Sequence, residues 1–274
     1  RNISLSDGSG LLFLFFREIG NNALNAFIVA VLPLLFTFII FFGVVYAEGI
    51  HVNIPITMGR RGTGGRYPVK FLYVSNMPVI LAVALFANMR IWASLTAGIP
   101  FLGGVMNAVS TIVIPPYGLF QQLLLEGISG QLIDQMVQSF VNLQFIGLGG
   151  SIIHALIYLV IFVVVCVLFG RFWIELGGQG PDKVAGQLQK AGMYIPGFRR
   201  DPRVIRQVLE RYIPTITVLG SAFVAVLAWT ADMTNVLGSG TGILLTVGIV
   251  YRLYEELAKQ QLMEMHPMLG RILG

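Results

Sequence analysis

The sequence predicts an all-α protein, a polytopic membrane helix bundle with five transmembrane helices and an external amphipathic or re-entrant helix. Charged residues make up 11% of the 274 residues and apolar residues 55%, whereas a soluble domain carries about 25% charged residues. A soluble globule so poor in charge would expose large apolar patches and aggregate. Apolar stretches of bilayer length recur along the chain, separated by basic or glycine-rich connections, and this pattern indicates a membrane protein.

The transmembrane helices are predicted from the lengths of these apolar stretches. A hydrocarbon core of ~30 Å requires about 20 apolar residues in a helix. Of the stretches that meet this length, 152–174 is the clearest, and 236–254 is the weakest because four glycines dilute it. The predicted spans are residues 24–47, 71–95, 152–174, 212–231 and 236–254. They leave an external link at 1–23, cytoplasmic loops at 48–70 and 175–211, and an external loop at 96–151.

The placement of lysine and arginine predicts the orientation. The loop at 48–70, the loop near 175–211 and the C-terminal tail together hold 15 of the 18 cations, counting Arg171 with the second loop. Cytoplasmic segments carry an excess of Lys and Arg. We therefore expect a multi-pass protein of the cell membrane, with the N-terminus of this segment outside and its C-terminus in the cytoplasm. Nothing in residues 1–10 looks like a signal peptide, and a chain that begins with Arg1 is expected to be either a fragment or a cleaved product of something longer.

The external loop at 96–151 is long and apolar and contains no Lys or Arg. Its apolar residues recur at helical spacing, which predicts an amphipathic helix on the outer bilayer boundary or dipping into the bundle. A partly ordered loop is the alternative. The sequence PPYGL at 115–119 is expected to break the chain just before this helix. The apolar positions are Leu125, Ile128, Leu132, Ile133, Met136, Val137 and Phe140.

Three polar or helix-breaking residues mark the second span. Pro78 lies near its start, where proline initiates helices readily; the alternative is a local weakening that lets the helix tilt or part from a neighbour. Asn76 lies near the interface, where water could solvate it. Asn88 lies three turns deeper, so its amide should face another helix or a watery cavity, either as interhelical glue or as part of a functional site.

The sequence lacks the residues that several classes of function require. The sequence shows no intramembrane Asp or Glu pair at helical spacing, which argues against a proton-coupled pump. It shows no hydrolase, protease, nucleotide-binding or metal-ligand motif, so we expect no enzyme, no metal and no cofactor. Glu48 is expected to extend its carboxylate out of the inner end of the first span. The glycines of 238–245 are expected to allow close helix approach rather than to bind a nucleotide.

Three long motifs carry a resemblance to a known family. They read YPVKFLYVSNMPVILAVALFAN at 67–88, AGMYIPGFRRDPRVIRQVLERYIPTITVLGSAFVAVLA at 191–228, and GSGTGILLTVGIVYRLYEE at 238–256. In order and spacing the chain resembles SecY, the pore-forming subunit of the Sec protein translocase, in its archaeal and eukaryotic branch. The resemblance covers nearly the whole chain and corresponds to the C-terminal half of SecY, its sixth to tenth spans.

The resemblance implies a passive protein-conducting channel with a lateral gate, driven by a bound ribosome or motor. It places Ile80 and Leu245 in the aliphatic pore ring, because they match the ring positions of the two corresponding spans. It makes the second span one wall of the lateral gate, with Asn76, Pro78 and Asn88 as gate residues. It assigns docking of the ribosome or motor to Arg60 and Arg61 in the first basic loop and to Arg199 and Arg200 in the second.

The implied partners are SecE-type and small beta-type translocase subunits, ribosomal RNA, signal sequences and nascent polypeptides, membrane lipid, and the N-terminal half of the same channel. That half is required because these residues alone cannot form a sealed pore. Two alternatives from other classes remain open at this point. One is half of a secondary transporter, for which broken helices are also typical. The other is a structural scaffold for membrane assembly.

Overall fold

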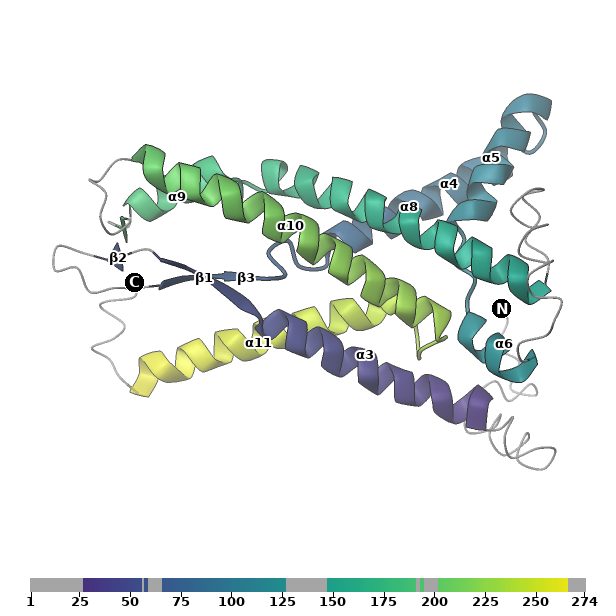
Figure 1. Cartoon of the computed structure of the whole chain (residues 1–274), viewed down its shortest axis with the longest axis horizontal. Coiled ribbons are helices and arrows are strands. Elements are labelled where there is room, and N and C mark those ends of the chain that lie inside the picture. Colours follow the sequence, from purple (N-terminus) through teal and green to yellow (C-terminus); the bar gives the residue numbers. More distant parts are fainter. Residues whose placement is uncertain are drawn as a thin grey trace.

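The computed structural model describes residues 27–55, 57–58, 66–126, 147–190, 193–194 and 202–265. Within them the chain is a bundle of long helices with short two-stranded sheets at one end (Figure 1). The helices are the π-helix η1 Phe27–Val31 and α3 Leu32–Gly49, α4 Met77–Thr96, α5 Pro100–Val113, α6 Leu119–Glu126, α8 Gly147–Leu176, α9 Pro181–Lys190, α10 Pro202–Met233 and α11 Gly240–Met265. The strands are β1 His51–Pro55, β2 Thr57–Met58, β3 Arg66–Lys70 and β4 Met193–Tyr194.

The prediction of an all-α membrane bundle is confirmed. Within the part of the chain that the structure describes, 4 helices are long and apolar enough to cross a membrane, and they are α3, α4, α8 and α10. Helix α11 forms where the fifth span is predicted, but its second half carries Arg252, Glu255, Glu256 and Lys259 and it does not reach the same apolar content. The fifth membrane crossing therefore stays a prediction.

Two helix boundaries differ from the predicted spans for identifiable reasons. Helix α10 begins at Pro202, about ten residues before the predicted span, because its charged first turns pair with each other in solvent; Arg206 contacts Glu210 one turn on at 2.8 Å. Helix α4 begins at Met77 instead of residue 71. Residues 71–76 form a turn, in which Ser75 adopts a left-handed conformation with φ of 54°.

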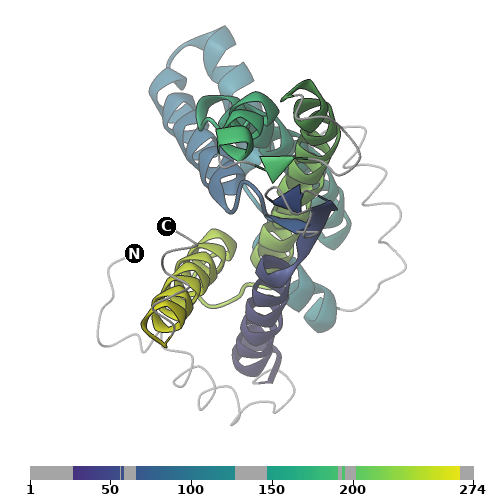
Figure 2. The same ribbon diagram turned by 90° about the vertical axis from the view of Figure 1, so that its left-hand side faces the viewer.

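Helix α10 holds the bundle together. It packs on α8 most extensively and also contacts α3, α4, α9 and α11, whereas α4 packs mainly on α5 and α8, and α11 mainly on α3. Its core-facing positions include Ala225, Ala228 and Ala231, all fully buried. Small residues at these positions allow helix backbones to approach closely, as interfaces in membranes require. Figure 2 shows α11 beside α3 on one side of the molecule and α4 with α5 on the other.

The two basic loops meet at one end of the bundle. Strands β1 and β3 from the first loop pair antiparallel, with His51 opposite Lys70, and β2 pairs with β4, which belongs to the second loop. A second apolar cluster lies beneath them and joins β3, the end of α8, α9 and the start of α10; its fully buried members include Leu209 and Ile213. The described parts of both loops thus lie at the same end, as the charge pattern predicts (Figure 1).

In the described part of the external loop before residue 127, α5 and α6 are separated by a break at 114–118, where the PPYGL sequence predicts one. The apolar helix α5 precedes this break, where no helix was expected. Of the apolar positions in the predicted amphipathic helix, Leu125 lies in α6. The remaining apolar positions, Ile128, Leu132, Ile133, Met136, Val137 and Phe140, lie outside the described residues.

Candidate functional site

The turn before α4 is the centre of the candidate site. It ends at Asn76, whose backbone carbonyl accepts a hydrogen bond from the backbone N–H of Ile80 at 3.2 Å and so begins the helix. Pro78 is buried in the first helical turn, where its missing N–H leaves no donor unpaired. This position agrees with the interpretation of Pro78 as a helix-initiating residue.

Glycines let the surrounding helices approach this turn closely. A Cβ atom at Gly220 of α10 would lie 2.7 Å from the carbonyl oxygen of Phe71. A Cβ atom at Gly248 of α11 would lie 2.7 Å from Nδ2 of Asn76. Both distances are shorter than van der Waals contact allows, so each glycine is needed for the packing seen here. Helix α10 therefore closely approaches the backbone of this turn, and α11 closely approaches the side-chain amide of Asn76.

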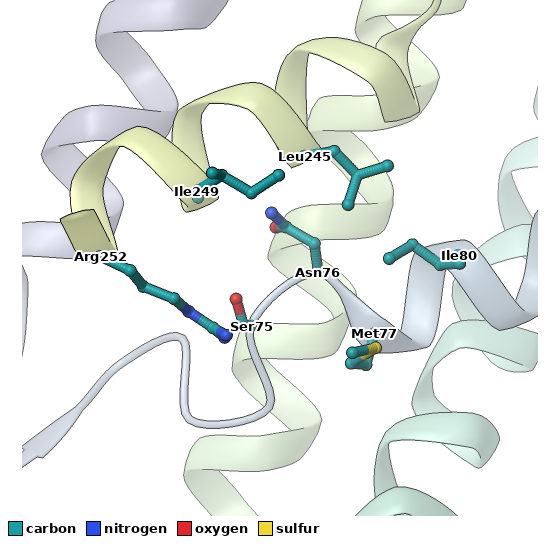
Figure 3. Close-up of a pocket in the computed structure, with 8 residues that line it drawn as sticks. Ser75, Asn76, Met77, Ile80, Leu245, Ile249 and Arg252 are labelled. Atoms are coloured by element: carbon teal, nitrogen blue, oxygen red, sulfur yellow. The ribbon is translucent and has the colours of Figure 1, made fainter.

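A cavity of about 150 Å³ lies between this turn and α11. Its lining is mostly apolar, with Ile80 of α4 on one wall and Leu245 of α11 on the other (Figure 3). Ile80 is half-buried, and Leu245 is 37% exposed. The structure thus brings together two residues that are 165 positions apart in the sequence and that the resemblance pairs. Among the described residues, the lining consists of Ser75, Asn76, Met77, Ile80, Leu245, Gly248, Ile249 and Arg252.

The Asn76 side chain joins the two walls of the cavity. It is 5% exposed, and its Nδ2 atom donates a hydrogen bond to the backbone carbonyl of Leu244 in α11 at 2.5 Å. This amide is therefore not solvated at the interface, as the sequence allowed, but is buried between helices. Figure 3 shows it directed from the turn toward α11.

A polar cluster continues from this amide to the end of the bundle where the basic loops lie. Lys70 of β3 contacts Glu255 of α11 at 2.5 Å, and its ammonium group lies 5.3 Å from the ring centroid of Tyr251. Glu48 of α3 is only 4% exposed, so the expectation that its carboxylate extends into solvent is wrong. The close packing of α11 on α3 covers it. Among the described residues, neither Oε1 of Glu48 nor Oδ1 of Asn76 has a hydrogen-bond partner.

The other predicted site residues are not brought into this cavity. Asn88 is exposed, and its Nδ2 atom donates to the carbonyl of Ala84 in its own helix at 2.9 Å, so it is not interhelical glue among the described residues. An exposed amide is satisfied in this way because the i−4 carbonyl is always within reach in a helix. The predicted docking residues Arg60, Arg61, Arg199 and Arg200 lie outside the described residues.

A second cavity of about 180 Å³ lies further along α4, beside Val83, Phe86 and Arg90. It is lined by Arg90, Tyr117 and the buried carboxylate of Asp232, among other residues. Oδ1 of Asp232 accepts a hydrogen bond from the N–H of Gly240 at 3.3 Å and so stabilises the first turn of α11. Burial raises the pKa of the Tyr117 phenol, and the nearby carboxylate of Asp232 raises it further.

Sequence reasoning missed Gly248, the Leu244 carbonyl and the burial of Glu48. The prediction that small residues in 238–245 allow close helix approach is confirmed at Gly240, where a Cβ atom would lie 2.6 Å from the carbonyl oxygen of Ala228. The same signal extends to Gly248, two turns further along the helix. The partner of each glycine could not be inferred, because the contacts join distant parts of the chain.

Comparison with known sequences identifies relatives over nearly the whole chain. A sequence profile of the SecY family matches residues 5–254. The protein translocase subunit SecY of Methanococcus vannielii is 43% identical over 273 residues, which cover 97% of this chain and 56% of that protein. The subunit of the same name from Methanothermobacter thermautotrophicus is 45% identical over 251 residues, covering 89% and 50% of the two chains.

Solved structures agree with the sequence relatives. A structure of SecY, described as one in which the plug domain stabilises the closed state of the translocation channel, superposes with a TM-score of 0.67 at 37% identity. A structure described as a protein-conducting channel gives a TM-score of 0.65 at 35% identity. Both matches cover 94% of this chain and 56% or 55% of the other. The chain spans about half the length of the relatives that it matches.

Proposed function

The chain belongs to the SecY family, and from this premise we propose that it is the C-terminal half of a protein-conducting channel that passes polypeptides across and into the membrane. One observation carries the proposal: Ile80 and Leu245, on two different helices, line the same cavity. The rest of the pore ring would come from the N-terminal half, and we call the two halves with their small SecE-type and beta-type subunits the assembled channel.

The chemistry of the two residues suits a polypeptide pore. Branched aliphatic side chains offer no fixed hydrogen-bond pattern, so a constriction made of them accepts chains of any sequence. When the constriction is closed, it is narrow and apolar, and such a passage resists wetting and ion leakage. We expect no enzymatic activity of this chain, because the driving force would come from a bound ribosome or motor.

Helix α4 would form one wall of a lateral gate through which signal sequences reach lipid. Its packing supports this role, because α4 rests mainly on α5 and α8 and α11 rests mainly on α3 and α10. The face of α4 that carries Ala84 and Asn88 stays exposed among the described residues. In the assembled channel this face would meet the opposite gate helices or the lipid. An exposed amide at Asn88 suits a surface that changes partners when the gate opens.

The basic end of the bundle would face the cytoplasm and dock the ribosome or motor. The pairing of β2 with β4 supports a common platform, because it joins the two loops that carry Arg60, Arg61, Arg199 and Arg200. Arginines present fork-shaped donors that match the phosphate oxygens of ribosomal RNA. The same placement would put the C-terminus of this segment in the cytoplasm and its N-terminus outside.

A photo-crosslinking amino acid at Ile80 tests the proposal. We expect the assembled channel to give adducts between this position and a secretory polypeptide arrested during translocation. The matched control is the same amino acid at Phe42, a 65% exposed residue of α3 that should face lipid and give no adduct. Absence of an adduct at Ile80 under active translocation would reject the channel. Solute uptake without adducts would support a transporter. If neither adducts nor solute uptake is observed, the structural scaffold is the hypothesis that remains.

A further inference from the structure

We propose that Asn76 is a positioning residue that holds Ile80 and Leu245 on facing walls of the constriction. The inference rests on the proposed function only in treating the two sides of the cavity as walls of a pore constriction. The geometry itself is independent of that function. In this inference the buried amide fixes the start of α4 against the N-terminal part of α11 in the resting channel.

The bonding of Asn76 leads to both residues. Its backbone carbonyl accepts from the N–H of Ile80, and its side-chain amide donates to the carbonyl of Leu244, the peptide group that joins Leu244 to Leu245. One residue is therefore hydrogen-bonded, from its two ends, to the backbone next to each aliphatic side chain. A shift of Asn76 relative to either helix would change the distance across the cavity.

Access to the Leu244 carbonyl depends on Gly248. In an α-helix each carbonyl accepts the N–H of the residue four positions later, and the side chain of that residue crowds its second lone pair. Gly248 occupies this position, and a Cβ atom there would lie 2.7 Å from Nδ2 of Asn76. The helix thus carries an opening for the amide at the one turn where Leu245 is presented.

Little direct packing between α4 and α11 competes with this bond. Each helix rests mainly on other partners, and a cavity separates them beside the amide. Because Asn76 is buried, breaking the bond would leave a buried donor unpaired, which is costly away from water. The hydrogen bond is therefore positioned to determine the distance between α4 and α11 across the cavity.

The charges around the amide determine how it can be tested. Glu48 approaches it from α3, with one carboxylate oxygen 3.7 Å from a Cβ atom at Gly248. Arg252 of α11 lines the same cavity, and Lys70, Glu255 and His51 act electrostatically on Glu48. An aspartate at position 76 would keep the shape of asparagine. When ionised it would have no donor for Leu244 and would add a second negative charge beside Glu48, but when protonated its O–H could donate in place of the amide.

The experiment measures crosslinking between cysteines at Met77 and Ile249, which line the cavity from α4 and α11. A short bifunctional thiol reagent is applied to the assembled resting channel; the native thiol of Cys166 is fully buried and gives little background. We expect Asn76→Ala to slow crosslinking roughly three- to tenfold, the range that corresponds to one lost hydrogen bond. Ser94→Ala is the matched control, because the exposed Ser94 hydroxyl donates only within α4, to the carbonyl of Ile91 at 2.7 Å, and it should leave the rate unchanged.

Two further variants separate positioning from a general loss of structure. Gly248→Ala should slow crosslinking to a similar degree, with no additional effect in the Asn76→Ala background. Asn76→Asp should slow it at alkaline pH, where the new carboxyl group is ionised, and recover toward the wild-type rate on acidification, while the wild type scanned over the same range shows no such recovery. A wild-type rate in Asn76→Ala, or an Asn76→Asp variant with no pH response, would overturn the inference. Either result would leave the polypeptide adduct at Ile80, and hence the proposed function, untouched.

Discussion

The contact between α8 and α10 yields a quantitative prediction for Gly170→Ala. A Cβ atom at Gly170 would lie 2.1 Å from Oγ and 3.1 Å from Cβ of Ser221. The two helices form the most extensive pair in the bundle, so neither can move aside freely. Overpacking of this kind costs about 1–3 kcal/mol of unfolding free energy, which exceeds the roughly 1 kcal/mol that alanine gains over glycine in a helix. Gly170→Ala should therefore destabilise the bundle.

Ser221→Ala provides the second arm of a double-mutant cycle. Oγ of Ser221 is buried without a hydrogen-bond partner among the described residues, so its removal should be neutral or stabilising by up to about 1 kcal/mol. Because Ser221→Ala also removes the atom that the new methyl group would strike, the double variant should recover most of the lost stability. The two sites should show a favourable coupling of about 1–2 kcal/mol.

The assay is unfolding of the assembled channel in micelles by a denaturing detergent, followed by helical circular dichroism. Gly43→Ala is the matched control, because no atom lies within 4 Å of a Cβ atom at Gly43 and the substitution should stabilise by up to about 1 kcal/mol. A Gly170→Ala variant as stable as the wild type would refute the reasoning. So would a double variant no more stable than Gly170→Ala alone.

The remaining predictions concern other parts of the molecule. Asp232→Ala should lower the unfolding free energy by about 1–2 kcal/mol in the same assay, because the N–H of Gly240 loses its acceptor, and Asp232→Asn should retain most of the stability. Trp229→Phe should cost about 1 kcal/mol, since its indole N–H donates to the carbonyl of Ala155 at 3.0 Å; unchanged unfolding would contradict this. Reversing the charges of Arg199 and Arg200 to Glu should weaken ribosome binding and flatten its salt dependence, and an unchanged salt titration would count against docking by this loop.

The centres of the helices could be predicted from the sequence because the bilayer length sets a strong requirement on apolar runs. Helix α8 covers the whole of the clearest predicted span and extends slightly beyond it at both ends. Pro78 could be placed in a first helical turn because its chemistry permits few other positions. The pairing of Ile80 with Leu245 came from the family resemblance, since no periodicity within the chain links two residues so far apart.

Contacts between distant segments could not be predicted from one sequence. Glu48 was expected in solvent because it ends an apolar run, but the packing of α11 covers it. The bond from Asn76 to the Leu244 carbonyl depends on where α11 crosses the turn before α4, and the short pairing of β2 with β4 depends on how two loops fold over one end. In each case the local sequence is compatible with several neighbours, and tertiary packing selects one.

The central claim is that Ile80 and Leu245 flank the path of a translocating polypeptide. The most direct test is a cryo-electron microscopy map of the assembled channel with an arrested secretory chain. The account predicts continuous density of an extended polypeptide that passes between these two side chains and contacts both. Density that crosses the membrane elsewhere, with lipid around Ile80 and Leu245, would contradict it.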